Sequence, residues 1–186
     1  GFKLFWDQHG LKAGGRPVKI FYADSMCNPD NTMAQARRLI HADKVDYIMG
    51  GLCGHVGPAL AQVSRETGVP MLIIPGADEL TKWDLVPTVI RTSGAASQIG
   101  HPFGTYLYDE LGARNVTFIG QDYAWGHGIT LGAAKTFKEK GGKVAKILWT
   151  KIGTADYGPV LASIPTDTDY VAAVVVGADL LRLFNA

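Results

Sequence analysis

The chain has 186 residues, and its 18 basic and 17 acidic side chains leave a formal net charge of +1. This balance argues against a protein whose task is to coat nucleic acid or an anionic membrane. Hydrophobic residues make up 47% of the chain and charged residues 19%, which excludes intrinsic disorder for the chain as a whole. The longest apolar runs, such as 171–176, are far shorter than the roughly 20 residues of a membrane-spanning helix.

A recurring pattern divides the chain: a helix-like stretch, a glycine, one or two polar residues and a short apolar run. Because glycine suits the left-handed conformation that closes a helix, each occurrence indicates a helix end followed by a strand. The predicted strands are short, β-branched and apolar on both faces, which is typical of parallel sheets covered by helices. They cover residues 18–22, 45–49, 71–74, 116–120, 143–149 and 170–176.

Apolar residues recur at helical spacing between these strands. Met33, Ala36 and Ile40 share one helix face. Asn28 and Pro29 are suited to begin that helix, because Asn accepts from a free N–H and Pro fits the first helical position. A wider stripe on a later helix comprises Ile99, Phe103, Tyr106, Leu107 and Leu111. The predicted fold class is therefore α/β, doubly wound around parallel sheets.

The middle of the chain interrupts this alternation. Residues 87–94 resemble a short strand that leaves one sheet and feeds a long helix. We therefore expect a boundary near residues 92–97, with lobe one at 1–94, lobe two at 95–186 and a strand-like hinge between them.

The motifs that would indicate an enzyme or a nucleotide site are not found. Gly126 and Gly128 follow a predicted strand and open a helix, as in a dinucleotide-binding fingerprint. However, Leu131 occupies the place of the third glycine, and Gly132 comes one residue late. The sequence contains no phosphate-binding loop, nucleophile elbow or HExxH motif. We expect no catalysis and no cofactor.

None of the five histidines has the spacing of a metal ligand set, so no metal site is expected, and four of them fall into two groups. His9 and His41 lie near predicted helix ends, where a cation complements the helix dipole. His55 and His127 follow predicted strands, in loops at the carboxyl ends of the sheets, where α/β proteins bind ligands. The alternative for both is a solvated loop histidine.

The two cysteines, Cys27 and Cys53, each follow a predicted strand by a few residues. They would lie on the same edge of one sheet, where their loops can meet. Either they form a disulfide, which indicates an oxidising compartment, or they are two buried thiols.

Several stretches, taken in their order and spacing, carry a resemblance over nearly the whole chain. They are CNP (27–29) with AQARRLI (34–40), VDYIMGGLC (45–53), GVPMLIIPGA (68–77), RTSG (91–94) and DYAWGHG (122–128). In this order they resemble the type I periplasmic solute-binding proteins of ABC importers, specifically the branched-chain amino-acid binding family.

The resemblance implies a fold of two lobes that close around a small solute by a hinge, without catalysis. It implies amino-acid transport, a membrane permease as partner, no nucleic-acid partner, and a periplasmic or extracellular location. It also implies a disulfide between Cys27 and Cys53. The alternative is the ligand-sensing domain of a receptor or regulator with the same fold.

Members of the family are longer than this chain, so the resemblance implies an incomplete fold in residues 1–186. It places a further strand between 18–22 and 45–49, and continues lobe two beyond Ala186. Without that strand, the two segments would face a gap with unpaired backbone groups.

The resemblance also assigns ligand contacts on the first lobe. Gly54 and His55 lie in the turn that grips the ligand carboxylate, where the family commonly has Ser or Thr. Ala77 and Asp78 lie in the loop that contacts the amino group, and Asp78 takes the place of a Thr. A carboxylate there favours an ammonium group and repels a carboxylate.

On the second lobe, the resemblance assigns Trp125 as an aromatic cover over the ligand, and Gly177 as part of the far wall. A Trp can stack on an aromatic ring or a cation, although packing between the lobes is the alternative. The departures at 54, 55 and 78 leave the ligand open among an amino acid, an aromatic acid and an amide.

Overall fold

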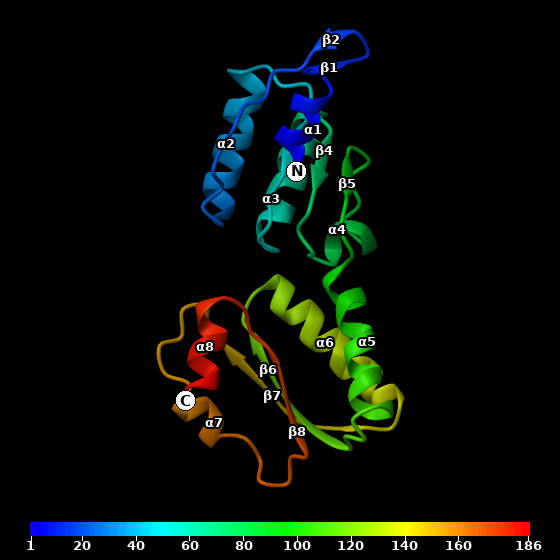
Figure 1. Cartoon of the computed structure of the whole chain (residues 1–186), viewed down its shortest axis with the longest axis vertical. Helices are drawn as coiled ribbons and strands as arrows, with labels where there is room; N and C mark the ends of the chain where they lie inside the picture. Colours follow the sequence, from blue (N-terminus) through cyan, green and yellow to red (C-terminus); the bar gives the residue numbers. More distant parts are fainter.

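The computed structural model describes all residues from 1 to 186. It contains two separate three-stranded sheets and one small hairpin. One sheet belongs to the N-terminal half, drawn at the top of Figure 1, and the other to the C-terminal half below it. Both sheets are parallel throughout. The predicted α/β class is therefore confirmed.

The N-terminal sheet has the order β3-β4-β5. Its strands are β3 (Ile48–Gly50), β4 (Met71–Ile73) and β5 (Val89–Arg91). Its helices are α2 (Pro29–His41), α3 (Val56–Thr67) and the short α4 (Glu79–Lys82). Leu39 of α2, Val63 of α3 and Met71 of β4 belong to one buried apolar cluster, which holds these elements together.

Two helix ends follow the local chemistry of the sequence. The Asn28 side chain accepts a hydrogen bond from the Asn31 N–H at 2.9 Å, and Pro29 begins α2. At the other end of the next helix, Gly68 has φ of 72°, the left-handed conformation that closes α3. Both predicted boundaries are confirmed.

The predicted strand at 18–22 is wrong. The chain begins instead with α1 (Phe2–Gln8) and a hairpin of β1 (Lys12–Ala13) and β2 (Arg16–Pro17). Val18 N–H donates to the Leu11 carbonyl at 2.7 Å, but residues 19–23 make no backbone-to-backbone hydrogen bond. An extended segment becomes a strand only beside a partner strand, and here none lies within hydrogen-bonding reach.

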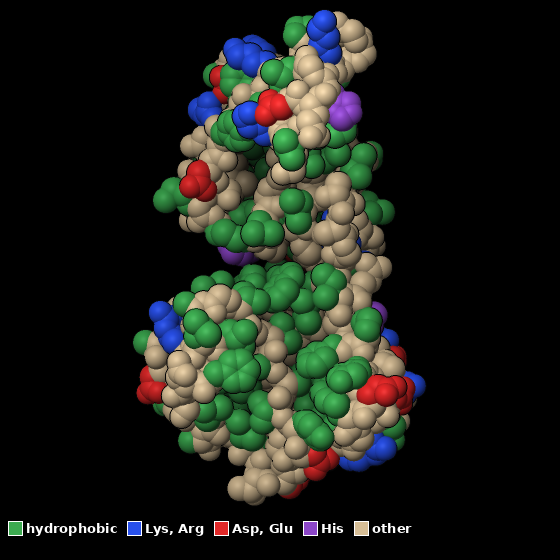
Figure 2. Space-filling view, in the orientation of Figure 1, with side chains coloured by type: hydrophobic (Ala, Val, Ile, Leu, Met, Phe, Trp, Pro, Cys, Tyr) green, Lys and Arg blue, Asp and Glu red, His purple; other side chains and the backbone are tan.

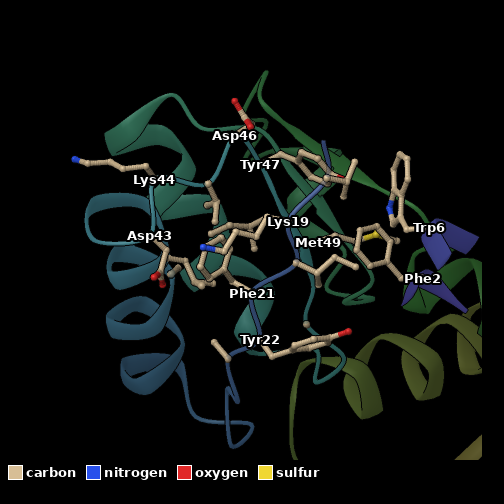
Figure 3. A pocket seen from close by; sticks show the side chains of 18 of the residues that line it. Phe2, Trp6, Lys19, Phe21, Tyr22, Asp43, Lys44, Asp46, Tyr47 and Met49 are labelled. Atoms are coloured by element: carbon tan, nitrogen blue, oxygen red, sulfur yellow. The ribbon is translucent and has the colours of Figure 1, made fainter. Parts of the chain in front are cut away.

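A groove of about 680 Å³ separates this segment from β3. Figure 3 shows its side chains, among them Phe21 and Tyr22 on one side and Tyr47 and Met49 on the other. The Ile48 N–H donates to the Pro70 carbonyl, and the Gly50 carbonyl accepts from the Ile74 N–H. Both residues therefore direct their backbone groups to the side of β4. In a parallel strand the residue between them faces the opposite edge, so the Met49 backbone faces the groove. The gap that the resemblance implies is therefore present.

The C-terminal sheet is longer and has the order β7-β6-β8. Its strands are β6 (Asn115–Gln121), β7 (Lys143–Thr150) and β8 (Tyr170–Val174). Its helices are α5 (Ala96–Asp109), α6 (Ala124–Glu139), α7 (Gly158–Ala162) and α8 (Ala178–Phe184). Every residue of the central strand β6 is buried.

Helices α5 and α6 pack through glycines. A Cβ at Gly100 would collide with the Ile129 carbonyl, and one at Gly104 with the Ala133 carbonyl. A Cβ at Gly128 would collide with the methyl group of Ala96. This glycine, part of the rejected nucleotide motif, therefore allows two helices to approach closely.

The stripe predicted on α5 is only partly correct. Leu107 is buried, but Ile99 and Tyr106 are each 50% exposed. Because the glycine face of α5 makes the contact with α6, a narrower row of apolar residues is buried than hydrophobicity alone predicts. Residues 89–91 do form the short strand expected before α5, and the chain crosses between the halves just after it.

Candidate functional site

Loops from both sheets meet between the two halves. In Figure 1 the arrowheads of β6 and β7 point toward the N-terminal half. A Cβ at Gly54, after β3, would lie 2.9 Å from the Trp125 amide nitrogen, after β6. A Cβ at Gly76, after β4, would lie 3.2 Å from Trp125 Cδ1. Trp125 of the C-terminal half therefore contacts two loops of the N-terminal half.

The same contact brings two helix N-termini together. Helix α3 begins directly after His55, and α6 begins at Ala124, one residue before Trp125. Each N-terminus carries partial positive charge. The amides of residues 124–126 at the start of α6 have no backbone acceptor, whereas in α3 the Val56 and Gly57 N–H groups donate to the Cys53 and Gly54 carbonyls. The donors without a backbone acceptor on that side are the amides of residues 54 and 55, directly before α3. Two such ends close together favour an anion beside them. On the face shown in Figure 2, the waist between the halves shows few charged side chains.

Aromatic rings surround this point. Tyr123 stacks on Trp125 with ring centroids 6.0 Å apart, and meets the His55 ring edge-to-face at 6.1 Å. Burial raises the pKa of Tyr123 above its usual value, which keeps its hydroxyl protonated at neutral pH. Tyr123 is not among the residues predicted from the sequence. Its position two residues before Trp125, in a loop after a buried strand, is the signal that could have found it.

The disulfide between Cys27 and Cys53 is present, with Cα atoms 5.6 Å apart. It lies directly beside the site, because the His55 Nε2 atom is 2.5 Å from the Cys27 carbonyl oxygen. A carbonyl only accepts, so Nε2 carries the proton and donates. The disulfide therefore joins the two loops that fix the orientation of the His55 ring.

Ala77 and Asp78 follow Gly76 on the same loop, but their polar atoms face the crossing between the halves. The Ala77 carbonyl accepts from Arg91 Nη1 at 2.8 Å. Asp78 accepts from Lys82 Nζ at 2.5 Å and from the Ser97 N–H at 3.1 Å. Partial burial opposes ionisation of Asp78, but the hydrogen bonds from Lys82 and Ser97 prevail and lower its pKa below the usual value.

Gly177 lies at the carboxyl edge of the C-terminal sheet, where it precedes α8 with φ of 66°. No atom lies within 4 Å of the place where its Cβ would stand. Beside it, the buried Asp179 accepts from Gln121 Nε2 at 2.9 Å and from the Gly153 N–H at 2.7 Å. This network, which the sequence analysis missed, ties together the loops that follow all three strands.

A second histidine lies on the same edge. The His127 ring stacks on Trp149 with centroids 4.0 Å apart and an angle of 5°, and its Nε2 lies 2.7 Å from an Asp122 oxygen. Its side chain remains 39% exposed. Of the predicted residues, the structure therefore brings Gly54, His55 and Trp125 together, with His127, Asp78 and Gly177 outside that contact.

The structure contains no group of three or more His, Cys, Asp or Glu side chains placed to hold a metal ion. None of its helices combines the length and the apolar character that a membrane crossing requires.

Comparison with known proteins identifies the fold family. Residues 1–186 match the family described as periplasmic binding protein. The chain belongs to this family. The type I architecture that the sequence resembles is confirmed by solved structures that superimpose on nearly the whole chain.

Two of these structures carry aromatic acids. A solute-binding protein of an ABC transporter from R. palustris, in complex with benzoate, is 28% identical with a TM-score of 0.86, over 97% of this chain and 50% of that one. Another, from Rhodopseudomonas palustris HaA2 in complex with p-hydroxybenzoic acid, is 28% identical with a TM-score of 0.88, over 98% and 50%.

A curated relative has a different description. The "Amino acid binding protein" of Pseudomonas aeruginosa is 29% identical over 117 residues, which are 62% of this chain and 31% of that protein. The chain thus spans about a third of this relative and half of the solved structures.

Proposed function

We propose that residues 1–186 belong to the solute-binding component of an ABC importer, which captures a small carboxylate between two lobes by hinge closure. The lobes are residues 1–94 and 95–186. The protein acts outside the cytoplasmic membrane, in the periplasm or the extracellular space, and delivers its solute to a membrane permease. It binds and releases the solute without chemical change.

The observation that carries this proposal is the meeting of the α3 and α6 N-termini at Gly54 and Trp125. A carboxylate held there would accept hydrogen bonds from both halves and so favour the closed arrangement. Family membership supports the same conclusion, because binding of a solute is the activity its name describes.

We further propose that the carboxylate belongs to an aromatic acid. The Tyr123 and Trp125 rings stack with an angle of 24° between their planes, and His55 adds a ring edge. Such rings stabilise a planar aromatic ligand by stacking and by excluding water. Structures 28% identical to this chain contain benzoate and p-hydroxybenzoic acid, which supports the same class. Asp78, the residue that favoured an ammonium group, has its carboxylate already paired with Lys82.

Calorimetric titration with 4-hydroxybenzoate, benzoate and leucine tests the proposal. We expect saturable binding, tighter for the two aromatic acids than for leucine, with each probe recovered unchanged. Trp125→Ala is expected to weaken binding of 4-hydroxybenzoate about fivefold or more, because truncation of an aromatic anchor in a binding site costs over about 1 kcal/mol.

Trp83→Ala is the matched control. Trp83 is 72% exposed at the end of α4, so its removal should leave the affinity unchanged. An affinity that is the same in Trp125→Ala and in the wild type would remove Trp125 from the site. Conversion of a probe to a product would contradict the proposal as a whole.

A further inference from the structure

The first turn of α5 is completed by groups from the other half of the molecule. The residue before the helix is Ala95, which has no side-chain oxygen to cap the free N–H groups. Instead, the Ala96 N–H donates to the Gly76 carbonyl at 2.8 Å. The Ser97 N–H donates to Asp78 Oδ1 at 3.1 Å. Two N–H groups in the first turn of α5, a helix of the C-terminal half, therefore find their acceptors in loop 76–78 of the N-terminal half.

A lysine completes this contact. Lys82 Nζ donates to Asp78 Oδ2 at 2.5 Å and to Ser97 Oγ at 2.8 Å. The Asp78 side chain is only 15% exposed, and both of its oxygens are engaged. Asp78, Lys82 and Ser97 therefore form one hydrogen-bonded cluster, here termed the crossing cluster, which connects α4 to α5 (Figure 1).

The location of the crossing cluster gives it mechanical importance. Only residues 92–95 connect β5 to α5, and a single extended segment resists bending and twisting weakly. Hydrogen bonds beside that segment add a second connection, so relative rotation of the halves must strain or break them. Charge-assisted hydrogen bonds, of the kind that Lys82 and Asp78 form, are among the stronger polar contacts in proteins.

We infer that Asp78 is a hinge-positioning residue: it caps α5 across the boundary and thereby sets the relative orientation of the two halves. The effect of Asp78 on ligand binding rests on the proposed function, because the apparent affinity for a solute depends on the fraction of molecules in the closed arrangement. It assigns Asp78 a role in closure in place of the ligand contact that the sequence resemblance implies.

Asp78→Ala would remove both a helix cap and a connection between the halves, so the test must separate the two. Asp78→Ala combined with Ala95→Ser does so. Ser is a favoured N-cap residue, and Ala95 already has the extended backbone of one, with φ of −66° and ψ of 148°. The double variant therefore restores the cap of α5 within the C-terminal half, without restoring the connection.

Spin labels at Ala34→Cys on α2 and Lys138→Cys on α6, both exposed positions, report the distance between the halves in the absence of any ligand. We expect Asp78→Ala to lower the thermal midpoint and to broaden the distance distribution. The double variant should recover most of the midpoint but keep the broad distribution. Asp84→Ala removes an ion pair with Arg65 inside the N-terminal half, and should leave the distribution unchanged.

A narrow, wild-type distribution in the double variant would overturn the inference, because capping alone would then explain Asp78. The distance measurement needs no solute, so it stands even where the titrations with 4-hydroxybenzoate and leucine show no binding. In the reverse case, binding with unchanged distances in Asp78→Ala would overturn the hinge role and leave the proposed function intact.

Discussion

The two halves each contain a parallel three-stranded sheet, but they differ in strand order, β3-β4-β5 against β7-β6-β8, and in how completely the sheets are built. The N-terminal strands have three residues each, whereas those of the C-terminal sheet have seven, eight and five. β6 is paired on both sides and buried throughout. In contrast, β3 has a groove on its outer side, and the extended segment beyond it is unpaired.

This difference shows two ways to position the loops that follow the strands. In the C-terminal half, a long sheet and the Gln121–Asp179 hydrogen bond hold the loops at the strand ends. In the N-terminal half, where pairing is short, the loop before α3 is held by the Cys27–Cys53 disulfide and by the bond from His55 to Cys27. Covalent and side-chain contacts there replace what strand pairing provides in the other half.

The largest expected effect on stability is in the C-terminal half, whose sheet is the more completely paired one. Gly104→Val would place a branched side chain against the Ala133 carbonyl and Thr136, and so force α5 away from α6. Overpacking usually costs about 1–3 kcal/mol, but a Cβ that collides with a backbone carbonyl oxygen leaves no room for relaxation, so the cost should exceed about 4 kcal/mol. We expect loss of the cooperative thermal transition of the C-terminal half, measured by circular dichroism.

Gly94→Ala is the matched control for that substitution. A Cβ at Gly94 would meet nothing nearer than Ile99 Cγ1, at 3.6 Å, so the thermal midpoint should remain within about two degrees, as for most surface substitutions. A Gly104→Val protein that unfolds at the wild-type temperature would show that the α5–α6 contact does not limit the stability of this half.

Sequence reasoning predicted the elements whose partners lie within the chain. The five later strands, the Asn28 cap and the Gly68 helix end depend on local chemistry and on apolar runs, and the structure contains them. Residues 18–22 have the same apolar character, but pairing requires a neighbour that their own sequence does not specify. The predicted width of the buried stripe on α5 is too large for a related reason. The contact with α6 is made by Gly100 and Gly104, which a pattern of apolar side chains does not reveal.

The site was less predictable than the fold. The loops at strand ends, and with them Gly54, His55 and Trp125, follow from topology and from the family resemblance. The direction in which a polar side chain points cannot be predicted in the same way. Asp78 accepts from Ser97 across the crossing, and this contact depends on how the two halves pack. Tyr123 joins the site through a ring contact with a residue 68 positions away, which no local pattern encodes.

An intermediate effect is expected in the half with the short sheet. Replacement of both cysteines, Cys27→Ser with Cys53→Ser, opens a loop with a sequence separation of 26. On the chain-entropy model this lowers the free energy of unfolding by about 3.5 kcal/mol. Amide exchange should accelerate in the N-terminal half, around α2 and the loop before α3, and remain unchanged in β6. Equal acceleration in both halves would contradict the idea that the disulfide replaces strand pairing locally.

The smallest effect concerns the crossing cluster, where the two halves meet. Because the pKa of Asp78 in the folded protein lies below 3.8, its usual value, its contribution to stability is complete above that pH. This contribution is lost as the pH falls through the lowered pKa, because below it the carboxylate is protonated in the folded and in the unfolded protein alike. At neutral pH, Asp78→Asn should therefore reduce stability by about 1 kcal/mol, the usual net contribution of an intramolecular hydrogen bond.

The pH dependence must be measured as a difference between two proteins. Bonds to Arg37 and Lys143 also lower the pKa values of Glu66 and Asp167, and these exposed carboxylates respond to acid in the wild type and the variant alike. Subtraction of the two denaturation series, from pH 7 down to pH 3, isolates Asp78. The difference should shrink in the acid range; a difference that stays constant to pH 3 would show that the charge of Asp78 does not contribute to the connection between the halves.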